Sequence, residues 1–386
     1  MGIKIVRVTT VPMSLKFLIK GQAAFMRDNG YEVLLVSSEG PEISDVEAYE
    51  GCKHYTVPLT RKITPLTDLA CVFRLFFFLI REKPDLVHSH TPKAGVVSMI
   101  AAYLARIPIR LHTVAGLPLT ESAGIKRAIL ILAEKITYKF ASKVYPNSYG
   151  LKNIIMDLGL ARDDKLCIIG NGSSNGINTS YFDPQLYSKN QKNQIRSEFG
   201  IQREEFVFIF IGRLVGDKGI NELVSAFNDL CSELSDIKLL LVGPFEDDLD
   251  PLNELTKFLI EDNEKIVSVG YQDDVRPFLS IAHILVFPSY REGFPNVVLQ
   301  AGSMGLPSIV TDINGCNEII KEEHNGIIIP SKDSKSLKWA MLKLIKDTDL
   351  YMTCSGNARK TIVNNYEQGV FWNALLEEYE YLVHTL

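Results

Sequence analysis

Residues 284–295 read ILVFPSYREGFP and continue as NVVLQAG through residue 302. The first four residues form an apolar run that is typical of a buried strand. A tight loop with one carboxylate, Glu292, follows, and Pro295 then opens a helix, since proline suits the first helical turn. The free backbone N–H groups of such a turn favour anions. The stretch therefore predicts a strand, loop and helix that bind a phosphorylated ligand.

Similar apolar runs alternate with helix-length segments along the whole chain. Such alternation indicates βαβ units and parallel sheets covered on both faces. In the first half the predicted strands are 3–8, 31–38, 55–58, 85–89, 109–113, 144–146 and 166–169. In the second half they are 206–212, 237–243, 266–270, 284–288, 308–311 and 326–330. We therefore expect an α/β protein with two Rossmann-like, doubly wound domains.

The length of the chain also favours two domains. Its 386 residues are too many for one hydrophobic core. Residues 171–184, NGSSNGINTSYFDP, are rich in turn formers and predict a connector. The domains are placed at residues 1–180 and 181–365, with a last helix over residues 366–386.

Composition excludes several classes of protein. The six cysteines are scattered and lack metal-ligand spacing, so they are expected to be reduced core residues of a cytosolic protein. A strand begins near residue 3, so no signal peptide is expected. The longest apolar run, residues 75–80, is far shorter than the roughly 20 residues that span a bilayer.

Charge is distributed unevenly along the chain. Residues 1–150 hold 19 Lys and Arg against 12 acidic residues, whereas the whole chain has a net charge of −5. A basic half suits an anionic membrane surface or a phosphate-bearing acceptor. Nucleic acid is not expected as a partner, because no basic run is interleaved with aromatic residues.

Two cations follow another predicted strand. Residues 206–219 read FVFIFIGRLVGDKG, which places Arg213 and Lys218 at the carboxyl end of the strand. Ligands of open α/β sheets bind at such ends. The planar fork of Arg213 and the mobile charge of Lys218 could clamp a diphosphate, here in a cleft between the two sheets. The alternative is a solvated loop with two ordinary surface charges.

Four segments together resemble the retaining glycosyltransferases of family four. They are GRLVGDKG (212–219), VGYQDDV (269–275), residues 284–312 and NGCNEII (314–320). The resemblance covers essentially the whole chain and is greatest for bacterial enzymes of capsule, O-antigen or glycan-lipid synthesis. It implies a GT-B fold, in which the last helix packs back on the first domain. It also implies retaining transfer of a hexosyl or N-acetylhexosaminyl unit from a nucleotide sugar, expected to be UDP-linked, to a polyprenyl-diphosphate-linked acceptor.

The resemblance implies no cofactor and no metal. The sequence agrees, since it has no acidic DxD-type cluster at a strand end: Asp247 and Asp248 lie in an acidic loop, and Asp273 and Asp274 open a helix.

The resemblance also assigns roles by position. Arg213 and Lys218, next to Gly212, would hold the diphosphate and stabilise the leaving charge. Glu292 would bind hydroxyls of the transferred sugar, and Tyr271 would line the base pocket. Glu318 would approach the sugar or phosphate, or simply open a helix. The other donor-binding positions are Gly293, Phe294, Pro295 and Gln300.

Gln300 departs from the family pattern. Relatives usually carry a second glutamate here, eight residues after the first, that grips the ribose hydroxyls. Gln300 can still accept and donate one hydrogen bond each, but without charge assistance: about 0.5–1.5 kcal/mol against 1.5–3 for a charged bond. We therefore expect weaker nucleotide binding, not loss of activity. The alternative is a glutamine on the helix surface.

The acceptor side is expected in the first domain. His90 lies at the end of a predicted strand, whereas His88 falls within it and reads as a core residue. Relatives often place a cleft histidine where this chain has Ala115, so His112 is the candidate substitute. The full set of acceptor-binding candidates is Ser14, Lys16, His90, Lys93, His112 and Gly116.

A peripheral membrane helix is a further hypothesis. A predicted helix combines Arg74 with four large apolar residues, Leu69, Phe73, Phe76 and Phe77. Such a helix could lie on anionic lipid. Core packing is the more common outcome of such a pattern. With this contact the protein would work in the cytoplasm, at the inner face of the membrane.

Two other functional classes share the expected architecture. A nucleotide-sugar 2-epimerase would need further acid and base carboxylates beside Glu292. A non-catalytic nucleotide- or glycan-binding protein would not need Arg213, Lys218 and Glu292 together. An NAD-dependent enzyme is disfavoured, since no G-x-G-x-x-G follows the first strand.

Overall fold

The chain divides into two compact units. The computed structural model describes residues 2–121, 123–246 and 250–385. One unit consists of Met1–Gly176 and Gly369–Leu386, and the other of Ile177–Gln368. The sequence placed the corresponding boundary at residue 180.

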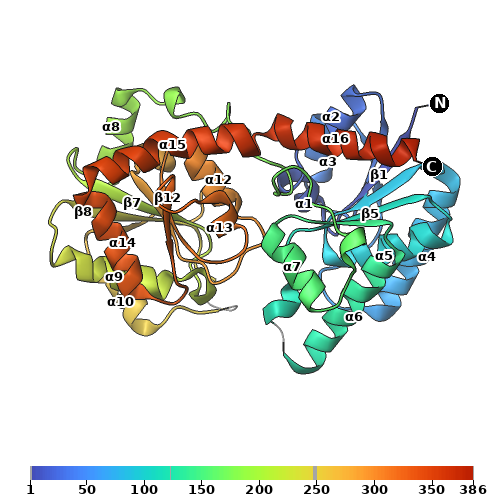
Figure 1. Ribbon diagram of the computed structural model, residues 1–386, viewed down its shortest axis with the longest axis horizontal. Coiled ribbons are helices and arrows are strands. Elements are labelled where there is room, and N and C mark those ends of the chain that lie inside the picture. The colour runs from blue at the N-terminus through green and yellow to red at the C-terminus, as the bar shows by residue number, and fades with distance from the viewer. Residues whose placement is uncertain (1, 122, 247–249, 386) are drawn as a thin grey trace. The chain divides into compact units, whose positions relative to one another are not determined.

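The first unit is built on a parallel sheet. Its strands are β1 (Lys4–Val8), β2 (Glu32–Ser37), β3 (Lys53–Thr56), β4 (Leu86–Ser89), β5 (Ile109–Val114) and β6 (Lys143–Pro146). They pair in the order β3-β2-β1-β4-β5-β6, and β1 and β5 are labelled in Figure 1. The order reverses between β1 and β4, the point where doubly wound sheets bind ligands.

Helices cover both faces of this sheet. They are α1 (Pro12–Phe17), α2 (Gln22–Asp28), α3 (Ile43–Glu50), α4 (Pro65–Glu82), α5 (Pro92–Leu104), α6 (Gly124–Phe140), α7 (Tyr149–Asp157) and α16 (Gln368–His384). On one face α5 lies between α4 and α6. On the other face Phe371, Leu375 and Tyr379 of α16 share a core with residues of α1 to α3. The end of the chain thus completes the first unit.

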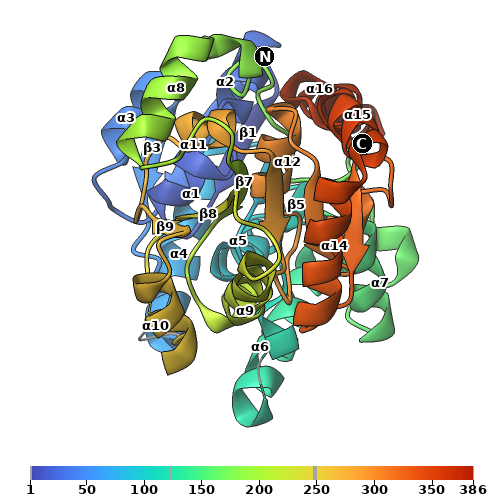
Figure 2. The same cartoon turned by 90° about the vertical axis from the view of Figure 1, so that its left-hand side faces the viewer.

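The second unit repeats the plan. Its strands are β7 (Phe206–Ile211), β8 (Ile237–Val242), β9 (Ile266–Ser268), β10 (Ile284–Phe287), β11 (Ser308–Thr311) and β12 (Gly326–Ile329). They pair in parallel in the order β12-β11-β10-β7-β8-β9. The helices are α8 (Lys189–Glu198), α9 (Ile220–Cys231), α10 (Glu254–Asp262), α11 (Arg276–Ile281), α12 (Asn296–Ser303), α13 (Cys316–Ile319), α14 (Ser334–Lys346) and α15 (Thr348–Tyr366). Helices α9 and α14 lie side by side (Figure 2).

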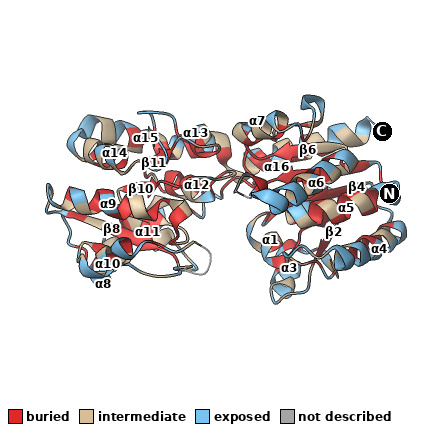
Figure 3. Ribbon diagram, turned by 90° about the horizontal axis from the view of Figure 1, so that it is seen from below, coloured by how far each residue is buried: buried red, intermediate tan, exposed pale blue. Residues whose placement is uncertain are grey.

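The buried residues of each unit concentrate in its sheet and on the inner faces of its helices (Figure 3). The two doubly wound sheets predicted from the sequence are therefore confirmed. No helix in the described residues is long and apolar enough to cross a membrane.

Several expectations need correction. Residues 166–169 do not form a strand: Leu166 makes one isolated bridge to Val144, and the apolar residues pack without a ladder. The last helix begins at Gln368, not at residue 366. Core packing was favoured for the outer residues of α4, yet Phe73 and Phe77 are 52% and 66% exposed. Asp247 and Asp248 lie outside the described residues.

Candidate active site

The turn between β10 and α12 is held from two sides in the second unit. The Thr311 hydroxyl donates to the carbonyl of Ser289, and the Asn314 amide donates to the carbonyl of Glu292. Pro295 occupies the N-cap position with φ −77° and ψ 109°, and α12 starts at Asn296. Pro295 therefore precedes the first helical turn instead of opening it. These bonds fix the path of the turn from Ser289 to Pro295.

Lys218 and Glu292 form an ion pair at this turn. The Lys218 ammonium contacts Glu292 Oε1, and each side chain is 16% exposed. The Ser289 hydroxyl also donates to Glu292 Oε1, at 2.9 Å. Gly219, next to Lys218, has φ +72°, and an added Cβ would lie 2.2 Å from the carbonyl oxygen of Pro288. The sequence resemblance assigns Lys218 to the donor diphosphate and Glu292 to the sugar hydroxyls, whereas the structure pairs the two side chains with each other.

Arg213 also has a carboxylate partner. Its Nη1 lies 3.0 Å from Glu246 Oε2, and the two side chains are 39% and 33% exposed. A pair this exposed contributes little to stability and exchanges partners readily. Arg213 is therefore available to an incoming anion at a small energetic cost. Gly212 precedes it at the end of β7.

The remaining donor-side candidates differ in their surroundings. Tyr271 is 67% exposed, and a hydrogen bond to Asp273 raises its pKa. Phe294 is buried and packs on Tyr366, with ring centroids 5.5 Å apart, so its side chain belongs to the core. Glu318 accepts a 3.3 Å hydrogen bond from the N–H of Gly315 at the start of α13. Gln300 is half-buried on α12.

Sequence reasoning missed the residues that brace the turn. Gly315 has φ +76°, and a Cβ there would lie 2.5 Å from the carbonyl oxygen of Gly293. Asn314 lies 3.5 Å from the same oxygen. The Asn-Gly pair after β11 was a turn signal, but nothing local could show that it packs on Glu292.

In the first unit, His90 lies just beyond β4, beside the point where the strand order reverses. It is 2% exposed, and both of its ring nitrogens are buried without a hydrogen-bond partner among the described residues. Burial lowers the pKa of His90 well below its ordinary value, and His88 and Arg7 lower it further. Its imidazole is therefore neutral at physiological pH.

His88 is a satisfied core residue, as the sequence indicated. Its Nδ1 lies 2.5 Å from the hydroxyl of Tyr379 in α16, and its Nε2 lies 2.8 Å from Thr113 Oγ1. Arg7 donates to the Tyr379 oxygen at 3.0 Å. The Tyr379 hydroxyl therefore donates to His88, whose Nε2–H donates to Thr113.

Two acceptor candidates have partners within the first unit. His112 is 1% exposed, and its ring packs against Gly95 of α5, on the face of the sheet opposite to His90. Burial lowers the pKa of His112 to about 3, and its Nδ1 lies 2.8 Å from Ser89 Oγ. Lys93 forms an ion pair with Asp68. Both have structural partners instead of an open position.

The other acceptor candidates lie at or near the surface. Lys16, in α1, lies 2.7 Å from Asp45. Ser14 is half-buried in the same helix. Gly116 is half-buried after β5, with open space where a Cβ would point. Within the described residues, no three His, Cys, Asp or Glu side chains gather as metal ligands.

Both parts of the chain match known sequence families. Residues 19–172 match the "Glycosyl transferase 4-like domain", and residues 191–361 match "Glycosyl transferases group 1".

Two curated relatives span most of the chain. The capsular polysaccharide biosynthesis glycosyltransferase CapM of Staphylococcus aureus is 33% identical over 97% of this chain and 96% of its own. An Escherichia coli UDP-Gal:α-D-GlcNAc-diphosphoundecaprenol α-1,3-galactosyltransferase is 29% identical over 87% of this chain and 85% of its own.

The fold is also that of solved structures. Anabaena HepE, solved in complex with UDP, has a TM-score of 0.82 and 19% identity, covering 98% of this chain and all of its own. The fold is thus GT-B, as the sequence resemblance implied.

Proposed function

This chain belongs to the group 1 glycosyltransferases with a 4-like N-terminal domain, and we propose that it transfers a sugar with retention from a nucleoside-diphosphate donor to a lipid-linked glycan. The second unit would bind the donor and the first unit the acceptor. The observation that carries the proposal is the Lys218–Glu292 pair at a braced turn, with Arg213 at the end of a strand of the same sheet.

The donor site would work by exchange of partners. An incoming diphosphate would take Lys218 from Glu292 and Arg213 from Glu246. The freed Glu292 carboxylate could then accept hydrogen bonds from hydroxyls of the transferred sugar. Because a glycosyl transition state resembles an oxocarbenium ion, the two cations would stabilise the charge that develops on the leaving diphosphate. Losing one such group typically costs about 10²–10³ in rate.

The proposed reaction uses no protein nucleophile. The bond between the anomeric carbon and the diphosphate oxygen breaks, and the acceptor oxygen forms its bond on the same face of the sugar. The departing phosphate oxygen takes the proton of the acceptor hydroxyl. No residue or metal ion is then required as a base, and charge compensation by Arg213 and Lys218 is the main contribution of the chain.

The names of relatives support a substrate class. The E. coli relative uses UDP-Gal and a diphosphoundecaprenol-linked acceptor, and HepE binds UDP. A Campylobacter jejuni relative, 26% identical over 82% of this chain, is an N-acetylgalactosaminyltransferase with a diphospho-undecaprenol acceptor. We therefore propose a UDP-linked hexose or N-acetylhexosamine as donor and a polyprenyl-diphosphate-linked surface glycan as acceptor.

A lipid-linked acceptor would bring the protein to a membrane surface. Helix α4 supports this, because Leu66, Leu69, Phe73 and Phe77 form an exposed apolar stripe at helical spacing. Exposed Arg74 lies on the same helix, and such cations are attracted to anionic lipid. We propose peripheral contact through this face.

A donor screen tests the proposed function. Each UDP-sugar is tested for thermal stabilisation of the protein, and the best ligand is then tested for hydrolysis and for transfer to N-acetylglucosaminyl diphosphate carrying a short alkyl chain. Stabilisation and transfer that persist in EDTA are expected, with an α-linked product from an α-linked donor. An epimerised nucleotide sugar without acceptor, or binding without turnover on any acceptor, would contradict the proposal.

A further inference from the structure

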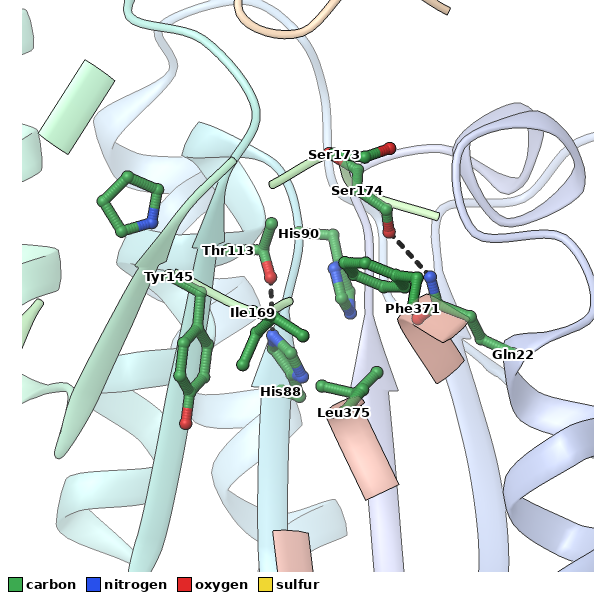
Figure 4. Close-up of a pocket in the computed structure, with 11 residues that line it drawn as sticks. Gln22, His88, His90, Thr113, Tyr145, Ile169, Ser173, Ser174, Phe371 and Leu375 are labelled. Carbon is green, nitrogen blue, oxygen red and sulfur yellow. Dashed lines mark hydrogen bonds between the residues drawn. The ribbon is translucent and has the colours of Figure 1, made fainter. Parts of the chain in front are cut away.

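A small polar pocket lies beside His90 in the first unit. His88, Gln22, Thr113, Ser173 and Phe371 are among its lining residues, and Figure 4 shows their side chains converging around the two histidine rings. The rings of His88 and His90 contact each other at an interplanar angle of 30°, with centroids 4.1 Å apart. The pocket is therefore lined by residues at or near the ends of β4 and β5, by the segment before Gly176 and by α16.

The pocket lacks a hydrogen-bond partner for His90. Both ring nitrogens are buried and unpartnered among the described residues. A neutral imidazole offers one N–H donor and one bare acceptor nitrogen. Leaving either group buried and unpaired is costly. One hydroxyl or water can pair with one of these two nitrogens, because it can either accept from the N–H or donate to the bare nitrogen.

Two neighbouring polar side chains of the pocket already have partners of their own. Both nitrogens of His88 are engaged by Tyr379 and Thr113. Gln22 accepts from Arg7 and donates to the carbonyl of Ser174. The hydrogen bonds to Tyr379 and Thr113 fix the ring of His88. The ring of His90 is held in turn by its contact with His88.

The size of the pocket limits its occupant. Its volume of about 10 Å³ is close to what one water oxygen needs. A phosphate group, with five heavy atoms, does not fit this space, whereas a single hydroxyl group does. The neutral state of His90 also removes the charge that an anion would seek there.

We propose that this pocket receives one uncharged hydroxyl group of the acceptor glycan, with His90 as a specificity-determining residue and Tyr379 as a positioning residue. The proposal rests on the proposed glycosyltransferase function and names the group that the acceptor presents. Without acceptor, a water would hold the same place. The diphosphate of the acceptor must then lie elsewhere.

Nuclear magnetic resonance of the intact protein tests the pocket directly. Histidine is labelled with ¹⁵N, and the His90 ring signals are assigned with His90→Phe. The probes are methyl α-N-acetylglucosaminide, methyl α-galactoside and inorganic pyrophosphate. We expect a neutral glycoside to shift the His90 ring signals and pyrophosphate to leave them unchanged. Shifts with pyrophosphate alone, or with no probe at all, would overturn the proposal, the latter by assigning the pocket to a structural water.

Steady-state kinetics gives an independent test. His90→Phe fills the pocket without a hydrogen bond, and Tyr379→Phe removes the hydroxyl that orients His88. Each should raise the KM for N-acetylglucosaminyl diphosphate with a short alkyl chain about 3- to 10-fold, with a smaller effect on the donor KM. His54→Phe is the matched control: His54 lies on β3 with its Nε2 2.8 Å from Ser37, and its loss should leave both KM values unchanged.

The outcomes separate the two proposals. Equal effects on the donor and acceptor KM values would make His90 a structural residue and overturn the pocket assignment. A wild-type protein that turns over no donor would contradict the proposed function, while the magnetic resonance result would still report what enters the pocket.

Discussion

The Lys218–Glu292 pair supports a double-variant experiment that separates stability from catalysis. Lys218→Met leaves the Glu292 carboxylate without its cation, and Glu292→Gln leaves Lys218 without its anion. Breaking a fully buried pair costs about 3–5 kcal/mol. Since both side chains remain 16% exposed, we expect about 1–3 kcal/mol for either variant. In a domain of 150–250 residues, a loss of 1 kcal/mol lowers Tm by roughly 2–4 °C.

The double variant, Lys218→Met with Glu292→Gln, removes both charges together. It should regain most of the lost Tm, because no unpaired charge remains, and the coupling of the two sites is expected to be about 0.5–3 kcal/mol. Its turnover should stay low by about 10²-fold or more, because the leaving diphosphate still lacks Lys218. The assays are thermal unfolding and UDP-sugar hydrolysis under identical conditions.

A matched ion pair in the second unit serves as control. Lys338 and Glu233 lie 2.7 Å apart and are 28% and 41% exposed. Lys338→Met should leave Tm and turnover nearly unchanged, because exposed ion pairs contribute little to stability. Recovery of wild-type turnover in the Lys218 and Glu292 double variant would refute the reasoning, because the pair would then act only in folding.

Four further predictions follow from individual side chains. Gln300→Glu should lower the donor KM by adding a charged partner for the ribose, and an unchanged or raised KM would exclude that contact. Gly315→Ala should cost about 1–3 kcal/mol through its left-handed backbone and raise the donor KM, since its Cβ would meet the turn between β10 and α12; a variant with the Tm and KM of wild type would contradict this role of Gly315. Burial raises the pKa of Glu134 to about 7, so the folded state favours the protonated carboxyl. Wild type should therefore lose about 3 kcal/mol of folding stability as the pH rises from 4.5 to 7. The pH profile of Glu134→Gln should lack this loss. Phe77→Ser should reduce sedimentation with anionic liposomes at low salt, and equal sedimentation of variant and wild type would remove α4 from the membrane contact.

The fold was predictable because local signals agree with each other. Every predicted strand of the second unit is present, since each is an apolar run between turn formers. The failure at residues 166–169 is instructive. Ile169 is 7% exposed, so the apolar run is buried as expected, but its only bridge to the edge strand β6 is the one between Leu166 and Val144. An apolar run indicates burial, whereas a strand also needs a ladder of hydrogen bonds to a neighbouring strand.

The site was predictable in its residue types and less so in its pairings. Arg213, Lys218 and Glu292 each follow a strand, which the pattern shows. The contact of Lys218 with Glu292 joins residues 74 positions apart, and no local signal encodes it. The surroundings of His112 also depend on long-range pairing, since it lies in register with Ser89 of the neighbouring strand β4. That register places its side chain on the face of the sheet opposite to His88 and His90, and only the assembled sheet fixes it.

The hydrogen bond between Arg7 and Tyr379 has a consequence for synthesis of the chain. These residues are 372 positions apart, so a ribosome releases Tyr379 only after it has made the whole second unit. Domains usually fold as units in the order in which they emerge. Here the first unit would wait with a buried arginine and an unsatisfied His88 until α16 arrives, after the whole second unit has been made. The unit whose translation starts first would then finish folding after the second unit.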